Sequence, residues 1–375
     1  MAHGPEQEFT GVLELIPSGS GFLRRLEEDL QPTQGDVFVP PSLIQQKGLQ
    51  QGMLMHVMAA HAQSRGQSPA VTKILDINNV PADSYSSDQS FERQISIDPS
   101  ERFILTPAPN PQSERSLRLL ELMTPIGKGQ RALIVAPPRT GKTTLLHDLA
   151  TAIATHHPET YLVVLLVDER PEEVTHFKRS VRGAVIASSS DQDAATHLRT
   201  ARLTLDLARS MAESGRDVFL LLDSITRLGR ASNREENNRG KTLSGGVGSR
   251  ALEFPRRFFG SARNLEGGGS LTIVATALID TGSRMDEVIF QEFKGTGNME
   301  LVLDRKLADS RLFPAVDLSQ SGTRKEEKIL PPDWLNASHK LRRHLSNLAP
   351  KDALDVLMER LSKAESVQAF CDTIL

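Results

Sequence analysis

The chain of 375 residues is 38% hydrophobic and 24% charged, and its formal net charge is −3. This length allows two or three domains with a sizeable core. No apolar run approaches the roughly 20 residues of a membrane span, the first residues lack the basic and apolar regions of a signal peptide, and the single cysteine, Cys371, excludes an intrachain disulfide. We therefore expect a cytoplasmic protein without a membrane segment.

The first 80 residues predict a β-domain. Five short apolar runs with alternating polarity are separated by turn residues, at Phe9–Ile16, Gly21–Arg25, Asp36–Val39, Met53–Ala60 and Ala70–Ile77. Five strands within about 70 residues are typical of a small barrel such as an OB-fold. We therefore assign residues 1–80 to a barrel domain that suits RNA binding.

Residues 81–116 predict a linker. Five prolines fall in this segment, at positions 81, 99, 107, 109 and 111. Such a composition favours an irregular chain that wraps around its neighbours or spaces them apart, and it disfavours a helix or strand of the core.

Residues 117–375 predict an α/β domain followed by a helical tail. Nearly continuous apolar runs predict strands buried on both faces, at Ala132–Ala136, Tyr161–Val167, Ala184–Ala187, Val218–Asp223 and Leu271–Ala277. Helical patterns alternate with them, at Thr143–His156, Pro171–Arg179 and Ala194–Glu213. This alternation indicates a mostly parallel sheet. The tail, residues 333–370, carries helical spacing at Lys340–Leu348 and Asp352–Leu361.

The segment 131–144 reads as a buried strand, a tight loop and the start of a helix, which is the context of a phosphate-binding P-loop. The loop's N–H groups and the helix N-terminus can hold phosphate oxygens, Lys142 can reach the β- and γ-phosphates, and the Thr143 hydroxyl can bind Mg²⁺. The alternative is a chance Gly-Lys-Thr at a helix start, because Ala136 replaces the usual first glycine. The predicted nucleotide-binding residues are Pro138, Arg139, Thr140, Gly141, Lys142, Thr143 and Thr144.

Two further strands end in carboxylates. Asp223 ends an apolar strand 81 residues after Lys142, where a P-loop ATPase needs a second Mg²⁺-organising group. Glu169 ends another strand at the sheet edge where α/β proteins bind ligands, and is the candidate for orienting the attacking water. Many buried strands end in Asp, and Glu169 could be a helix-capping acid, although Glu172 and Glu173 fit that role better.

Two glycine-rich basic segments follow. Between Ser224 and Arg263, nine cations face three glutamates, a net charge of +6. Within this stretch, residues 239–248 repeat the letters Gly-Lys-Thr around Lys241 without a preceding strand. Further along the chain, residues 293–298 again place one lysine, Lys294, among glycines. A flexible, positive loop suits contact with a nucleic-acid backbone, and the alternative is a solvated charged face.

Three arginines lie downstream of the predicted sheet, at positions 305, 311 and 324. An arginine that neutralises transition-state charge often comes from a neighbouring subunit. A lone arginine is more often a surface residue, so the sequence alone leaves such a finger unplaced.

These segments together closely resemble the bacterial transcription termination factor Rho family, hexameric RNA-dependent ATPases with a RecA-like motor. The resemblance runs from about residue 9 to the C-terminal helices and is strongest over 125–327. Among the matching segments are Leu133-Ile-Val-Ala-Pro-Pro138, Val167-Asp-Glu-Arg-Pro-Glu-Glu-Val-Thr175, Leu221-Leu-Asp-Ser-Ile-Thr-Arg227, Glu292-Phe-Lys-Gly-Thr-Gly-Asn-Met-Glu-Leu301 and Ser321-Gly-Thr-Arg-Lys-Glu-Glu327. The Ala136 version of the loop is the family's own.

The resemblance implies an OB-fold, cold-shock-like barrel followed by a RecA-like P-loop motor that uses ATP and Mg²⁺. It implies catalytic roles for Lys142, Glu169 and Asp223, Mg²⁺ binding by Thr143 and Asp223, and an arginine finger at Arg324 from the next subunit. The remaining matches are a second interface arginine at Arg311, adenine packing by Phe313, and RNA-gripping loops at Lys241 and at Lys294, Gly295, Thr296 and Gly297. The implied partners are single-stranded RNA, the RNA polymerase elongation complex and five further copies in a homohexamer.

Two departures from the family concern the N-terminal region. The chain begins almost directly at the barrel, whereas a helical subdomain often precedes it. In the barrel, Ser20 replaces one base-stacking aromatic residue, Phe22 and Arg24 remain, Phe38 replaces a tyrosine, and another usual tyrosine is absent near Pro69. Stacking contributes about 1–3 kcal/mol per base, so losing two platforms predicts primary RNA loading weakened by roughly 10²-fold or more.

Three hypotheses remain. The first is an ATP-dependent 5′→3′ RNA translocase that terminates transcription by releasing nascent RNA. The second is a paralogue that binds RNA and ATP but loads or translocates poorly. The third is a subunit of a rotary ATPase, which also has a RecA core; the lysine- and glycine-rich loops and the barrel argue against it.

Overall fold

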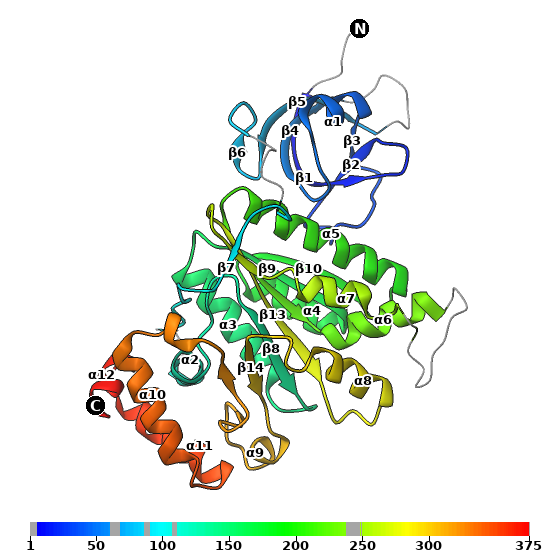
Figure 1. Cartoon of the computed structure of the whole chain (residues 1–375). Coiled ribbons are helices and arrows are strands. Elements are labelled where there is room, and N and C mark those ends of the chain that lie inside the picture. Colours follow the sequence, from blue (N-terminus) through cyan, green and yellow to red (C-terminus); the bar gives the residue numbers. More distant parts are fainter. Residues whose placement is uncertain are drawn as a thin grey trace.

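The computed structural model describes residues 6–60, 68–85, 91–106, 111–237, 248 and 250–374, which form a small barrel above a larger α/β domain (Figure 1). No helix among these residues is long and apolar enough to cross a membrane. The predicted fold class, an OB-like barrel followed by a RecA-like P-loop domain with C-terminal helices, is confirmed.

The barrel closes on itself. Its strands follow the order β3-β2-β1-β4-β5, and a pairing of Phe38 with Ala70 joins β3 back to β5. Closure removes the unpaired strand edges of an open sheet. The strands are β1 (Glu6–Leu15), β2 (Gly21–Arg24), β3 (Val37–Val39), β4 (Leu54–Ala60) and β5 (Ala70–Ile77), with β6 (Val80–Pro81) added beside β5 and helix α1 (Pro41–Lys47) between β3 and β4.

The larger domain is built on a sheet whose six central strands are parallel, in the order β10-β9-β11-β13-β8-β14. These strands are β8 (Arg131–Ala136), β9 (Tyr161–Glu169), β10 (Ala184–Ser189), β11 (Asp217–Asp223), β13 (Ser270–Leu278) and β14 (Met299–Val302). Short antiparallel strands extend it: β15 (Gly322–Thr323) pairs with β14, and β12 (Arg263–Leu265) with β13. Every predicted strand is present, with ends shifted by up to three residues.

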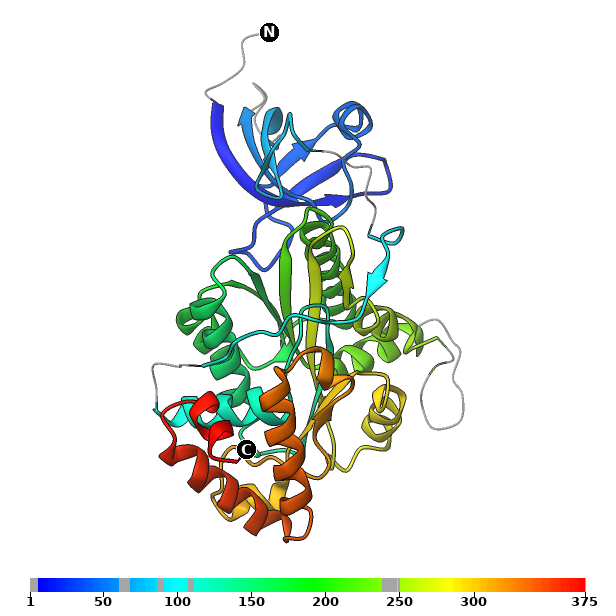
Figure 2. The same cartoon turned by 60° about the vertical axis from the view of Figure 1, so that its left-hand side comes forward.

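Helices cover both faces of this sheet (Figures 1 and 2). One core cluster combines sheet residues with α2 (Pro111–Met123), α3 (Lys142–His156) and α4 (Pro171–Ser180). The other face packs against α5 (Ala194–Glu213), α6 (Ile225–Asn237) and α7 (Glu253–Phe259). Further short elements are α8 (Arg284–Phe293), α9 (Arg305–Asp309) and the 3₁₀ turn Glu326–Lys328.

The C-terminal helices pack against α2 rather than extending into solvent. These helices are α10 (Pro332–Leu345), α11 (Pro350–Lys363) and α12 (Val367–Asp372), and Figure 2 shows them gathered beside α2. Cys371 is buried in the same core, and burial raises the pKa of its thiol to about 12, so this cysteine is a structural residue.

The interpretation of residues 81–116 as an irregular linker is incomplete. Its strand β7 (Ser96–Ile97) pairs with β12 and so joins the large sheet, and helix α2 begins at Pro111. Proline at the first position of a helix leaves no unmet N–H, so the Pro111 that indicated a loop in fact starts a helix.

Buried polar contacts fix the barrel on the α/β domain. The amide of Asn78, fully buried, donates to the Ser210 carbonyl and to the Ser214 hydroxyl (3.0 and 2.8 Å) on α5 and the residue after it. Glu14 of the barrel accepts from Arg199 of α5 at 2.6 Å. Separating the two parts would break these hydrogen bonds, which satisfy the buried amide of Asn78 and hold Glu14 to Arg199.

Candidate functional site

The loop between β8 and α3 has the backbone of a phosphate cradle. Gly141 precedes the helix at φ 84°, a left-handed conformation that glycine adopts without steric cost. The first helical hydrogen bond runs from the Leu145 N–H to the Gly141 carbonyl (3.0 Å), which leaves the N–H groups of Lys142, Thr143 and Thr144 outside the helical pattern. These groups and the positive end of the helix favour an anion here.

Lys142 lies between two buried carboxylates. Its amine donates to both oxygens of Asp223, at 2.5 Å for Oδ2, and lies 3.9 Å from Oε1 of Glu169. Asp223 is 2% exposed and Glu169 4%. The parallel sheet explains the convergence, since the P-loop follows β8 and the two acids end β11 and β9 at the same edge.

Two residues that sequence reasoning missed complete this cluster. Thr276 on β13, the strand between β8 and β11, donates its hydroxyl to Oδ1 of Asp223 at 2.8 Å. Arg227 on α6 forms an ion pair with Glu169 (Nε–Oε1 3.1 Å) and donates to the Asp168 carbonyl at 2.5 Å. A threonine within an apolar strand was the available signal for Thr276; Arg227 was counted only as part of a basic stretch.

Burial and charge set the protonation of Glu169. The pKa of its carboxyl is raised to about 7, first because burial disfavours the charged form and then because the Asp223 carboxylate is near, while Lys142 and Arg227 act in the opposite direction. A carboxylate whose pKa lies close to neutral pH can take a proton from water and release it again. The geometry therefore suits Glu169 to general-base chemistry.

A cavity of about 470 Å³ adjoins the P-loop on its other side. Phe313, 40% exposed, faces this space, and a side-chain carbon at Gly141 would lie 3.3 Å from its ring. An aromatic face beside a phosphate cradle can hold a planar base. The cavity is lined by Ser116, Arg139, Thr140, Gly141, Thr144, Leu145, Asp148, Leu303, Phe313, Pro314 and Ala315. Pro138 borders the same loop, where its carbonyl accepts from Arg305 (3.0 Å).

The two predicted catalytic arginines, Arg311 and Arg324, are exposed and, within the part of the chain that the structure describes, make no polar contact with the cluster of Lys142, Glu169 and Asp223. Arg324 follows β15, and its guanidinium donates to the Gly295 carbonyl at 3.2 Å. Arg311 is exposed two residues before Phe313. Among the described residues, no polar contact joins either arginine to Lys142, Glu169 or Asp223.

The predicted RNA-gripping loops are only partly described. Lys241 falls outside the described residues. The second loop begins with Lys294 at the end of α8, where the lysine is exposed and its amine lies 5.9 Å from the Phe290 ring centre. Gly295 donates its N–H to Glu300 (2.7 Å), and Thr296 caps the helix end through the Phe293 carbonyl (2.7 Å). Gly297, the last residue of the loop, is buried.

The predicted base-stacking residues of the barrel lie together. Phe22 on β2 and Phe38 on β3 are cross-strand partners, with ring centres 5.6 Å apart in an edge-to-face arrangement. Arg24 stacks on Phe22 (5.1 Å) but is 7% exposed and ion-paired with Glu14 (2.6 Å) and Asp36. Its charge is therefore already balanced, which makes Arg24 a support for the Phe22 platform more than a phosphate contact.

Ser20 does not replace the missing aromatic surface. It is 5% exposed, and its hydroxyl shares a hydrogen bond with the Ser18 hydroxyl at 2.8 Å. A short, buried and already bonded side chain offers no face to a base, so stacking on this side of the barrel depends on Phe22 and Phe38.

The parallel sheet, the phosphate cradle and the paired buried acids define a P-loop ATPase that carries a small N-terminal barrel. Residues 116–323 match the family model of the ATP synthase alpha/beta family, nucleotide-binding domain, and residues 9–83 that of the Rho termination factor, RNA-binding domain. The chain belongs to the transcription termination factor Rho family.

The similarity to curated relatives covers nearly the whole chain. The transcription termination factor Rho of Cereibacter sphaeroides is 47% identical over 364 residues, 97% of this chain and 86% of that protein. That of Aquifex aeolicus is 45% identical over 364 residues, 96% of this chain and 83% of that protein.

Two solved structures share the fold alone. An ATPase from the type III secretion system of pathogenic bacteria has a TM-score of 0.64 at 19% identity, over 84% of this chain and 93% of that one. The ATP synthase subunit NeqB from Nanoarcheaum equitans has a TM-score of 0.58 at 16% identity, over 75% and 80%.

We expect the kcat/KM for ATP to depend on a single group with a pKa of about 7. Because Glu169 acts as a base only when ionised, kcat/KM should fall about tenfold per pH unit below that value and level off above it. The measurement is ATPase activity with Mg²⁺ in excess, so that the phosphates of ATP do not titrate in the same range. A profile flat from pH 5.5 to 8 (roughly the working range of such assays) contradicts the assignment.

Phe22→Ala should weaken binding of a short single-stranded RNA by about 1–3 kcal/mol, a 5- to 150-fold rise in Kd, because one stacking platform is lost. The measurement is fluorescence anisotropy at one stated salt concentration, without nucleotide. Ile104→Ala is the control, since Ile104 is an exposed apolar residue (47%) that lies outside the barrel, whereas Phe22 is half-buried within it. Equal affinities in the two variants disprove a stacking role for Phe22.

Proposed function

We propose that this protein is an ATP-dependent RNA translocase that moves 5′→3′ and terminates transcription by releasing nascent RNA. The observation that carries the proposal is the meeting of Lys142, Asp223 and Glu169 at one edge of the sheet, in a chain whose barrel matches an RNA-binding family model. Family membership supports the same activity.

ATP binding would use the loop before α3 and the cavity beside it. The free N–H groups at the helix start hold phosphate oxygens, Lys142 neutralises their charge, and Phe313 packs against the adenine. Drawing Lys142 to the phosphates releases Asp223 from its ion pair. Thr143 and Asp223 then offer the hard oxygen donors that suit Mg²⁺, which supplies neutralisation of phosphate charge when bound.

Hydrolysis needs a base and a cation on opposite sides of the transferring phosphoryl group. Glu169 takes a proton from the attacking water, and Arg227 holds the Glu169 carboxylate in place from α6. Arg324 is exposed, and among the described residues it has no polar contact with Lys142, Glu169 or Asp223 of its own chain, which suits a finger donated to the next subunit. The ATP site would then be complete only in a ring, for which we propose a homohexamer with Arg311 at the same interface.

One contact would link RNA to hydrolysis. The Arg324 guanidinium bonds the Gly295 carbonyl in the loop that begins with Lys294, and the Arg324 N–H bonds the Asn298 carbonyl at 2.8 Å. RNA bound at this loop therefore shifts the arginine that completes the neighbouring site. We further propose the RNA polymerase elongation complex as partner and the cytoplasm as the compartment of action.

The barrel favours a translocase that loads RNA weakly over a protein with a different function. The second hypothesis, a paralogue that loads RNA poorly, rests on buried Ser20 and charge-balanced Arg24. The motor cluster is intact, so we propose a working translocase with weak primary loading. A rotary-ATPase role is disfavoured because residues 9–83 match an RNA-binding domain.

RNA should stimulate ATP hydrolysis by the wild-type protein, and Lys294→Ala should abolish the stimulation while leaving ATP affinity unchanged, because Lys294 is exposed and outside the ATP cluster. The measurements are ATPase rates across RNA homopolymers and nucleotide binding by fluorescence titration. Lys363→Ala, another exposed lysine at a helix end, is the control. Hydrolysis indifferent to every RNA in the wild type would overturn the proposed function.

Arg324→Ala and Glu169→Gln should each abolish hydrolysis, yet a mixture of the two should regain part of it. In a mixed ring, roughly a quarter of the interfaces pair an intact Glu169 with an intact Arg324 from the neighbour. The measurement is the ATPase rate of the equimolar mixture after subunit exchange. Mixing Glu169→Gln with Lys142→Ala is the control, because both changes lie on the same side of the interface; recovery there, or none in the first mixture, argues against a trans finger.

A further inference from the structure

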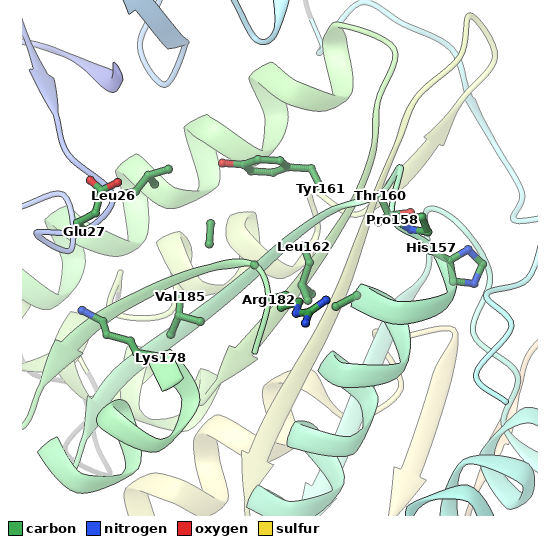
Figure 3. Close-up of a pocket in the computed structure, with 13 residues that line it drawn as sticks. Leu26, Glu27, His157, Pro158, Thr160, Tyr161, Leu162, Lys178, Arg182 and Val185 are labelled. Atoms are coloured by element: carbon green, nitrogen blue, oxygen red, sulfur yellow. The ribbon is translucent and has the colours of Figure 1, made fainter. Parts of the chain in front are cut away.

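A second cavity lies where the barrel meets the motor domain. It has a volume of about 630 Å³, within the range of small-molecule sites of about 300–1,000 Å³. Leu26 and Glu27 of the barrel form one wall, and the ends of α3 and α4 with the starts of β9 and β10 form the others (Figure 3). Cavities between domains are preferred places for ligands.

This cavity is separate from the ATP site. Tyr161 and Glu169 are the first and last residues of β9. A strand rises about 3.3 Å per residue, so they lie about 25 Å apart. The cavity therefore occupies the amino ends of the parallel strands, whereas the ATP cluster occupies the carboxyl ends.

Two buried hydroxyl groups of this wall lack partners. Thr160 Oγ1 and Tyr161 Oη have no hydrogen bond among the described residues, and Thr160 is 8% exposed. Buried polar atoms in folded proteins nearly always have a partner, so two exceptions on neighbouring residues beside one cavity mark a wall where a small side-chain shift would let a polar ligand supply the missing hydrogen bonds. Figure 3 shows the Tyr161 hydroxyl directed toward Leu26.

The charged groups of the cavity favour a ligand with an anionic group at one end and hydrogen-bond donors at the other. Arg182 is exposed and has neither an ion pair nor a hydrogen bond among the described residues, so its guanidinium is available. Lys178 is already paired with Asp29 at 2.7 Å. Glu27 lies away from Arg182 in Figure 3 and can accept from hydroxyl or amino groups. Between these ends the walls are apolar, formed by Leu162 and Val185.

We propose that this cavity binds a small organic phosphate with an apolar ring-bearing body, of the size and chemistry of a nucleoside monophosphate. Its phosphate meets Arg182 with the bidentate geometry that guanidinium groups offer, and its hydroxyl and amino groups meet Thr160, Tyr161 and Glu27.

Occupancy of the cavity would stiffen the junction between barrel and motor. The barrel loop is held on the motor at Asp29, which accepts from the Ala187 N–H (2.9 Å), and at Gln31, which donates to Thr200 (2.8 Å). A ligand that contacts Leu26 and Glu27 on one side and β9 and β10 on the other adds contacts across the same junction, and so biases the barrel toward this position.

The test uses the full-length protein with its ATP site saturated by ADP. The fluorescent probe 1-anilinonaphthalene-8-sulfonate has an aromatic body and one anionic group, and we expect one saturable site per chain. Adenosine 5′-monophosphate should displace it, whereas inorganic phosphate at the same ionic strength should not. Bound adenosine 5′-monophosphate should also slow amide hydrogen exchange in residues 26–31 and 184–187.

Variants locate the binding. Arg182→Glu should weaken the probe and the monophosphate at least tenfold, and Ala184→Trp should abolish both by filling the cavity. Arg179→Glu is the matched control: Arg179 is also exposed and lies three residues earlier in the chain, in the last turn of α4 and outside the lining. If Ala184→Trp fails to fold, Thr160→Val replaces it: this variant keeps the side-chain shape but removes the hydroxyl, and it should weaken binding of adenosine 5′-monophosphate. Unchanged binding in Arg182→Glu, or no displacement by adenosine 5′-monophosphate, overturns the proposal, and neither result bears on RNA-dependent ATP hydrolysis.

Discussion

Two buried carboxylates that share one lysine are the constraint around which the motor is organised. Asp223 and Glu169 come from different strands, and burying both negative charges is costly unless a cation and hydrogen bonds compensate. Lys142 is bonded to Asp223 and lies 3.9 Å from Glu169. Burial and the Asp223 carboxylate raise the pKa of Glu169 to about 7, although Lys142 and Arg227 act in the opposite direction. The same arrangement that holds the P-loop to β11 therefore also places a carboxyl group with a pKa of about 7 beside it.

The parallel sheet makes this arrangement possible. In parallel strands every carboxyl end lies at one edge, and a helix that follows a strand presents its positive N-terminus there. The opposite edge is left to the barrel, which is tied down by Asn78 and by the ion pair of Glu14 with Arg199. Glu14 also pairs with Arg24 beneath the Phe22 ring, so a continuous chain of contacts leads from the base-stacking surface to α5 of the motor.

These contacts also show that the ATP site is more tightly held than the aromatic surface of the barrel. The ATP cluster is held by several hydrogen bonds and ion pairs, whereas the aromatic surface of the barrel consists of Phe22, which packs on Phe38 and Arg24, and Phe38. In the function proposed above, RNA contacts at the Lys294 loop, where Arg324 is bonded to Gly295, would complement a modest loading surface. In the same proposal, coupling between RNA binding and ATP hydrolysis would act where the subunits meet.

The sequence alone determined the fold class and five of the six parallel core strands, because nearly continuous apolar runs follow from burial on both sheet faces. It also placed the loop before α3, Asp223 and Glu169 at the ends of these strands. It could not place Thr276 or Arg227, since their roles depend on which strands are neighbours and on how α6 turns back over β9. It also could not show that Pro111 starts a helix, that Arg24 is neutralised by Glu14 and Asp36, or that a cavity lies between the barrel loop at Leu26 and the starts of β9 and β10. Those features arise from contacts between residues far apart in the chain, and only tertiary packing decides them.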